Sequence, residues 1–347
     1  MAWETQSNYY SGQGVVLLGN RDAVTGRGYG FVPLGNVSDL TIAVKTSVVE
    51  HKESQSGARG IDLRLTTELA STASMKLDNF NATNLATALR GSYQSVAAAT
   101  VTAETNILYM GAVASLAKVG VAGVVVKRGA TTLTAYSNAA TAWDYKVNTD
   151  AGSIMFNDGQ SGQLLANLTT LGTACATPFA SVSGSKLTLT FAATPAHATV
   201  GKRMAIVVAT GADAAFVNGK SFVITAKTAT TVEVELGVTG KTITATGTTL
   251  CVFDGDTTIA VDYTSSQQVI VDSLTVAATE KYLRFEGLNT ADGNKPVVVE
   301  VFRFLTDPLK QLSLISDKVQ EYDLEGTVLL DTTQTTGSKY FRQTMLS

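Results

Sequence analysis

Two tripeptides in this chain carry the residues that end a phosphate-binding loop. They are Gly219-Lys220-Ser221 and Gly240-Lys241-Thr242. Such a loop needs the longer pattern GxxxxGK[ST], because its backbone must wrap the phosphates, and it must lead into a helix. The position five before Gly219 is Ala214, and the one before Gly240 is Glu235. Both tripeptides also run into strand-like sequence, so we do not expect a nucleotide site here.

The histidines and cysteines do not have the spacing of a metal site or of a catalytic site. His51 and His197 are far apart, and neither has a cysteine nearby in the sequence, so the spacing of a metal site is missing. Cys175 and Cys251 are either two separate buried thiols that act as small hydrophobic groups or neighbours, if the ends of their segment meet. In the second case we expect them to be reduced. We predict a protein that is not an enzyme and has no cofactor or metal.

Composition narrows the class of protein. The chain has 347 residues, 45% of them apolar and 16% charged, with a net charge of −3. This excludes a disordered chain and disfavours a protein that coats nucleic acid through phosphate contacts. Two cysteines are too few for a fold that depends on several disulfides. The start of the chain lacks the pattern of a signal peptide, and apolar runs such as 119–126 are shorter than the ~20 residues of a spanning helix. We expect assembly in a reducing cytoplasm.

The abundance of Thr and Val predicts a mainly β protein, because both side chains fit a pleated surface better than a helix. Residues 40–50 alternate like a strand, the polar stretch 51–60 resembles a hairpin tip, and 61–71 alternate again. The apolar residues of the second strand share parity, which predicts a long hairpin with one buried face: Ile61, Leu63, Leu65 and Leu69. Glycines recur along 1–35, which predicts an extended arm with bends.

One helix is expected within 79–91. Asn79 or Asn81 can cap its first turn, and Gly91 stands where a left-handed residue ends a helix. Its apolar stripe consists of Phe80, Leu85, Ala88 and Leu89.

The amino-acid composition of the chain changes at residue 157. Residues 157–253 are rich in Thr, Ala and Val and poor in charge, with short strands between turn signals. We predict a small inserted all-β decoration domain there, Ig-like or a small barrel. Residues 1–156 and 254–347 then form one discontinuous domain, since insertions are tolerated at exposed loop tips.

Several stretches resemble the tail tube proteins (major tail proteins) of siphophages. The first is EHKESQSGARGIDLRLTTELASTASMKLDNFNATNLATALRG, a charged hairpin followed by a helix. WDYKVNTDAGSIMF (143–156), TIAVDYT (258–264) and the stretch 282–331 follow in order. The resemblance covers most of 36–156 and 254–345, and the 157–253 segment is a departure that only some tail tubes carry.

The resemblance implies a β-sandwich or barrel flanked by one helix, whose copies form hexameric rings that stack into a hollow tube for the genome. The implied partners are further copies of the chain, other tail proteins at the tube ends, a tape-measure-like protein inside the tube, and genomic DNA that passes without specific binding. The location would be the virion tail. An exposed hairpin and loose arms fit this implication, because neighbouring copies can satisfy them.

Two sets of residues are candidates for the assembled state. We expect the hairpin tip to dock on the adjacent ring, through Glu50, His51, Lys52, Glu53, Gln55, Ser56, Gly57 and Arg59. A conduit that lets DNA slide needs a neutral to acidic wall. The carboxylates expected to line it are Glu321, Asp323 and Glu325, with Asp62 and Glu68 as weaker candidates. A solvated outer face is the alternative place for them.

A second class of function stays open. The chain can also be read as a monomeric surface-binding β-module for a carbohydrate or a receptor. The low aromatic content of 7% argues against that class, and the size of the particle in solution separates the two.

Overall fold

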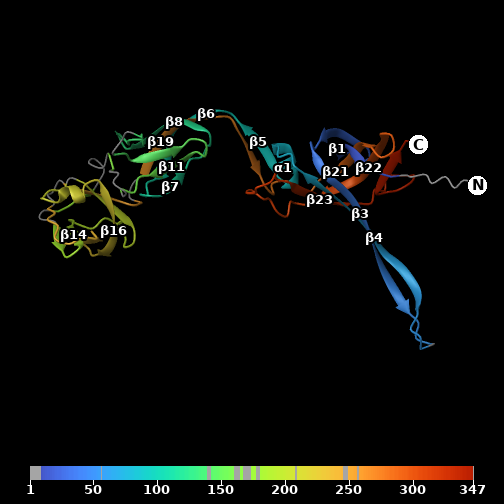
Figure 1. The fold of residues 1–347 in the computed structure, drawn as a ribbon, viewed down its shortest axis with the longest axis horizontal. Helices are drawn as coiled ribbons and strands as arrows, with labels where there is room; N and C mark the ends of the chain where they lie inside the picture. Colours follow the sequence, from blue (N-terminus) through green and yellow to red (C-terminus); the bar gives the residue numbers. More distant parts are fainter. Residues whose placement is uncertain are drawn as a thin grey trace, which may run out of the picture. The chain divides into compact units, whose positions relative to one another are not determined.

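The computed structural model describes residues 9–55, 57–138, 142–159, 165–166, 173–176, 180–207, 209–244, 249–255 and 258–346. The chain divides into two compact units, residues 1–95 with 269–347 (unit 1) and residues 96–268 (unit 2). Both are built from antiparallel sheets, as expected of a mainly β protein (Figure 1). The described residues contain one α-helix, and they include no helix of the length and apolarity needed to cross a membrane.

Unit 1 is one large sheet with a helix. The strand order is β2-β1-β21-β22-β23-β4-β3, and β24 also pairs with β22. The two strands that lead to and from unit 2, β5 and β20, pair with each other. The elements are β1 (Gly12–Arg21), β2 (Gly28–Pro33), β3 (Val37–Lys52), β4 (Ile61–Leu77), α1 (Ala82–Ala88), β5 (Ser92–Val96), β20 (Gln268–Asp272), β21 (Glu280–Asn289), β22 (Lys295–Thr306), β23 (Tyr322–Val328) and β24 (Phe341–Met345).

Alternation along the strands gives unit 1 a single core. In β23 the side chains of Tyr322, Leu324 and Val328 are buried, and in β4 those of Met75 and Leu77. They pack with residues of β1, β21, β22 and α1 in one cluster whose members all belong to unit 1. The core of unit 1 is therefore complete without unit 2.

The predicted helix forms, but its ends and its buried face differ from the prediction. Asn81 is the cap, and its side chain accepts the amide of Asn84. The left-handed residue is Arg90, with φ of 47°, and not Gly91. Gly91 is needed for another reason, because a Cβ there would lie 1.9 Å from the carbonyl oxygen of Asp272.

The buried residues of the helix are Asn84, Ala86 and Ala88, whereas Phe80 is 43% exposed. Asn84 occupies a core position because its amide donates to the carbonyl oxygen of Leu34 at 2.6 Å. Of the predicted stripe, only Ala88 is buried.

The described parts of the terminal segments are not the loose arms that the sequence predicted, and residues 1–8 lie outside the described residues. β1 lies inside the sheet between β2 and β21, and β24 pairs with β22 over Val297–Val301. Val16 and Leu18 of β1 belong to the core. The glycines permit close approach instead. A Cβ on Gly14 would lie 2.3 Å from the carbonyl oxygen of Glu286 in the neighbouring strand.

Unit 2 holds three sheets, in the orders β6-β19-β8-β9, β10-β11-β7 and β12-β18-β15-β16-β17-β14-β13. Its elements are β6 (Ala99–Ile107), β7 (Val113–Ser115), β8 (Val121–Arg128), β9 (Thr131–Thr132), β10 (Tyr145–Asn148), β11 (Ser153–Phe156), β12 (Thr173–Ala174), β13 (Ala180–Ser183), β14 (Lys186–Thr190), β15 (Arg203–Val207), the 3-10 helix η2 (Ala214–Phe216), β16 (Lys220–Lys227), β17 (Thr231–Glu235), β18 (Leu250–Phe253) and β19 (Thr258–Ser265).

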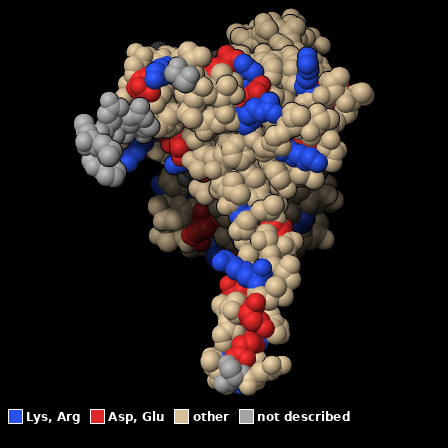
Figure 2. Space-filling view, turned by 90° about the vertical axis from the view of Figure 1, so that its right-hand side faces the viewer, with Lys and Arg blue, Asp and Glu red and all other residues tan. Residues whose placement is uncertain are grey.

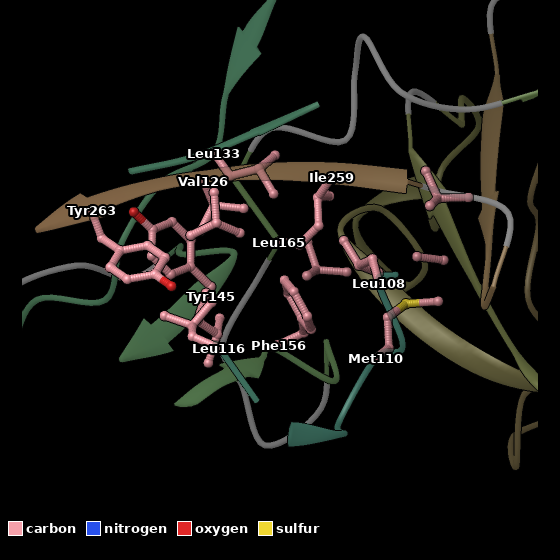
Figure 3. Packing of buried hydrophobic residues seen from close by; sticks show 14 of the residues in the cluster. Leu108, Met110, Leu116, Val126, Leu133, Tyr145, Phe156, Leu165, Ile259 and Tyr263 are labelled. Carbon is pink, nitrogen blue, oxygen red and sulfur yellow. The ribbon is translucent and has the colours of Figure 1, made fainter. Parts of the chain in front are cut away.

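The units divide the chain at different residues from the predicted boundaries 156/157 and 253/254. Residues 157–253 have a core of their own, but they also contribute Leu165, Ala205, Val207 and Val252 to the core of the first two sheets. Figure 3 shows Leu165 in the core of the first two sheets, next to Ile259 and Phe156. A strand that is buried on both faces joins two layers, so residues 96–156 and 254–268 belong with the insert rather than with unit 1.

Candidate assembly surface

The hairpin of β3 and β4 extends well beyond the other strands of its sheet (Figure 1). The two strands pair from Val37 with Leu77 out to Lys52 with Ile61. At the tip, the amide of Glu53 donates to the carbonyl oxygen of Gly60 at 2.8 Å. All described tip candidates lie on this projection and are exposed or partly exposed. Ser56 lies outside the described residues.

Charges of both signs follow one another along the hairpin (Figure 2). Nδ1 of His51 lies 2.7 Å from Oδ1 of Asp62, and Nε of Arg64 lies 3.6 Å from Oε1 of Glu50. All four side chains are more than a third exposed, so solvent screens these pairs and they add little to the stability of the single chain. Such charges serve better to set register with a partner.

The predicted buried face of the hairpin is not buried in the single chain. The exposed fractions are 55% for Ile61, 51% for Leu63, 54% for Leu65 and 56% for Leu69, and Val49 of β3 is 58% exposed. An isolated two-stranded ribbon has no second layer to cover its side chains. The hairpin thus exposes aliphatic surface over the nine residues 61–69, about 30 Å of strand.

A bulge also breaks the parity argument. Glu68 lies opposite Ser47 and Thr66 lies opposite Val48, so Thr67 is an extra residue in β4. Because side chains alternate with a period of two, the extra residue reverses the faces of those that follow. Leu65 therefore lies on the opposite face from Leu69, and both faces of the hairpin carry exposed aliphatic side chains.

β3 lies at an end of the strand order, so its outer side is a sheet edge. It is 16 residues long and has no proline, and Val48 and Val49 on it are exposed. A long edge strand with exposed aliphatic side chains is a template for pairing with another chain.

The carboxylates of β23 alternate with core residues as predicted. Glu321 and Asp323 are exposed and Glu325 is half-buried, whereas Tyr322 and Leu324 are buried. The three carboxylates therefore lie on the face of the sheet away from the core.

That face is not purely acidic. Lys76 of β4 lies directly opposite Asp323, and it also lies opposite Asp39 of β3. Lys310 pairs with Glu325, which raises the pKa of the lysine above its usual value. The face keeps an excess of carboxylates with two lysines among them.

Asp62 and Glu68 are not brought together with these carboxylates. Asp62 pairs with His51, and Glu68 accepts the hydroxyl of Ser47 at 3.3 Å. Glu68 precedes Lys76 by eight residues of β4, about 26 Å of extended strand. These two carboxylates belong to the hairpin rather than to the β23 face.

Sequence reasoning missed an apolar segment between β22 and β23. Leu314 is 80% exposed, Ile315 is 94% exposed and Val319 is 81% exposed. The signal was present in the stretch QLSLISDKVQ, where four large aliphatic residues, three of them strongly exposed, stand in a chain segment without strand pairing among the described residues. Exposed aliphatic residues so close together are a second candidate contact surface.

The two lysines of the phosphate-loop-like tripeptides have structural partners. Nζ of Lys220 lies 4.8 Å from the centroid of the Phe216 ring, and Nζ of Lys241 lies 5.2 Å from the same ring. Nζ of Lys241 is also 3.0 Å from Oδ1 of Asp213. Both lysines cover one aromatic ring, which accounts for their place in the fold.

Comparison with known families identifies the chain only to the level of an uncharacterised family. Residues 9–193 and 163–344 match the family described as "Protein of unknown function UCP028589", and the chain belongs to this family. None of the curated proteins compared with the chain matches it.

Proposed function

We propose that this protein is a structural subunit of a phage tail tube, in which hexameric rings of the chain stack into a conduit for the genome. The observation that carries the proposal is the projecting hairpin, with aliphatic side chains exposed on both faces. The resemblance of its sequence to the tail tube proteins gives the class of assembly. A head-to-tail contact that closes by rotation forms a ring, and copies of the ring can cover each other's exposed surfaces.

In this proposal the hairpin docks on the adjacent ring. The contact buries the side chains of Leu63, Leu65 and Val49. Burial of one leucine side chain contributes about 1.5–3 kcal/mol to the free energy of association. The pairs Glu50–Arg64 and His51–Asp62 set the register of the contact. Unit 2 lies outside the conduit, because a body of that size inside it would obstruct the passage.

The first experiment measures particle size. Purified protein at rising concentration should elute far above 36.3 kDa, and negative-stain images should show rings or tubes. Protein that remains at 36.3 kDa at every concentration contradicts the proposal. It favours the alternative, a monomeric surface-binding β-module, which a carbohydrate array would then test.

A second experiment tests the hairpin. The double change Leu63→Ser and Leu65→Ser should raise the concentration needed for assembly more than tenfold, because two buried leucines are lost from the contact. The matched control is Val200→Ser with Val223→Ser in unit 2, at sites 56% and 42% exposed. Both variants should keep the thermal midpoint of the monomer. Equal assembly by the two variants removes the hairpin from the contact.

The lumen assignment has its own test. We propose that Glu321, Asp323 and Glu325 face the channel, where carboxylates keep DNA from adhering. Changing all three to Lys should permit tubes but make them retain duplex DNA in a salt-dependent way and slow DNA delivery. The control changes Asp150, Glu235 and Asp272 to Lys. Retention of DNA by the control tubes alone, or by neither, overturns the assignment.

A further inference from the structure

Cys175 and Cys251 are neighbours in the core of residues 157–253. Their sulfur atoms lie 3.6 Å apart, both side chains are buried, and both thiols are free. Of the two arrangements that the sequence left open, the structure therefore shows neighbouring thiols. Their positions are 76 residues apart in the chain, so a covalent link between them would close a long loop.

The strands place both thiols on one face of the sheet. Thr173 lies opposite Cys251, Ala174 lies opposite Leu250, and the amide of Cys175 donates to the carbonyl oxygen of Thr249 at 2.9 Å. Cys175 and Cys251 are thus offset by two positions across an antiparallel pair, and residues at that offset point to the same side. A disulfide needs the sulfurs at about 2.05 Å, so they must approach by about 1.5 Å.

The two strands differ in how many strands hold them, although the amide of Ala176 after Cys175 also donates to the carbonyl oxygen of Thr190 at 2.8 Å. β12, which precedes Cys175, has two residues and lies at the end of the strand order, paired with β18. β18 itself is held between β12 and β15. A short edge strand opens and shifts at lower cost than a strand with two neighbours.

We propose that Cys175 and Cys251 form a disulfide-forming site that reacts with low-molecular-weight disulfides and locks the sheet of residues 175–251. This inference is independent of the proposed function, because it depends only on the geometry inside unit 2.

The reaction proceeds by two thiol–disulfide exchanges. The thiolate of Cys175 attacks one sulfur of the small disulfide, whose S–S bond breaks, and the released thiolate takes up the proton that Cys175 lost. The thiolate of Cys251 then attacks the sulfur of Cys175 and releases the second small thiol, which takes the proton of Cys251. The protein dithiol is oxidised to a disulfide, and the small disulfide is reduced to two thiols.

Exposure sets the order of the two steps. Cys175 is 4% exposed and Cys251 is fully buried, so the reagent meets Cys175 first. Burial raises the pKa of the Cys251 thiol well above its usual value, and its contact with Cys175 adds to the effect. The thiolate of Cys251 therefore forms less readily than an ordinary thiolate, and Cys251 acts in the second step, on the mixed disulfide at Cys175.

The test uses full-length protein and oxidised glutathione. After incubation and alkylation, intact mass should show loss of two hydrogens with no alkyl group added, and peptide mapping should join Cys175 to Cys251. The thermal midpoint of unit 2 should rise by a few degrees, because the link closes a long loop in the unfolded chain. Recovery of two alkylated thiols, or of a link between two chains, overturns the proposal.

Single variants test the order of reaction. Cys251→Ser should accumulate a glutathione adduct on Cys175, whereas Cys175→Ser should leave Cys251 at least tenfold slower to react. Equal rates in the two variants contradict the assignment of Cys175 as the first sulfur. The mass measurement on the unchanged protein decides the main proposal even if a variant does not fold.

Discussion

Strand β4 of unit 1 and strand β15 of unit 2 bury their side chains in opposite ways. β15 buries Met204 and Ile206 in one core and Ala205 and Val207 in another. β4 buries its last residues in the core of unit 1 and leaves residues 61–69 exposed. β15 is covered on both faces within the chain, whereas residues 61–69 of β4 leave their side chains in solvent. The proposed assembly surface therefore lies on unit 1.

Removing unit 2 from the chain tests most directly whether unit 1 folds without it. Replacing residues 97–267 by a short Gly/Ser linker should leave a soluble unit 1 that unfolds cooperatively, because its core contains residues of unit 1 alone. Replacing 160–253, nearly all of the 157–253 segment that the sequence favoured as the insert, should give an insoluble chain. That cut removes Leu165, Ala205, Val207 and Val252 from a core that stays behind.

Circular dichroism melting and amide dispersion in NMR spectra decide between the two shortened chains. A well-folded product from the 160–253 replacement would show that β15 and β18 are dispensable for the other layer. It would restore the narrower domain boundary.

Within β4, two leucines should differ in their effect on the monomer. Leu77→Ala removes a fully buried side chain and should lower the free energy of unfolding by about 2–5 kcal/mol. Leu65→Ala removes a side chain that is 54% exposed and should change it by no more than about 0.5 kcal/mol. Urea denaturation of monomeric protein measures both. Similar losses would show that the hairpin is covered within the single chain.

A smaller effect on stability is expected from the ion pair between Arg21 of β1 and Asp331, which precedes β24. Burial alone would raise the pKa of Asp331, but hydrogen bonds from Arg21 and Thr333 outweigh it and lower the pKa to about 2. Nη2 of Arg21 lies 2.7 Å from Oδ1 of this buried carboxylate. A folded pKa below the unfolded value stabilises the protein above about pH 4, and the contribution is lost as the pH falls toward 2.

The contribution of Asp331 is about 2 kcal/mol, from the difference between the usual pKa and the lowered one. Asp331→Asn should therefore lower the stability of unit 1 at pH 7 by about that amount and flatten its pH dependence between about pH 4 and 2. Unit 2 should melt as before. An unchanged acid transition in the variant would assign the transition to other carboxylates.

Local chemistry made several elements predictable. The Thr- and Val-rich alternation predicted a mainly β fold, the charged Gly-containing stretch predicted the hairpin turn, and an asparagine cap predicted the start of α1. The alternation of Glu321, Asp323 and Glu325 with Tyr322 and Leu324 predicted which face of β23 is buried. These features depend on residues close together in the chain, so the sequence determines them.

Long-range pairing decided the rest. The extra residue Thr67 turned Leu65 and Leu69 to opposite faces, and no local pattern announces a bulge that is set by the register with β3. The two compact units divide the chain at other residues than the sequence suggested, because β15 is apolar on both faces and only the packed layers show that it joins two cores. The sequence by itself determined only that Cys175 and Cys251 stand toward the two ends of the 157–253 segment. Only the pairing of β12 with β18 brought their sulfurs to 3.6 Å, because that contact closes a loop of 76 residues.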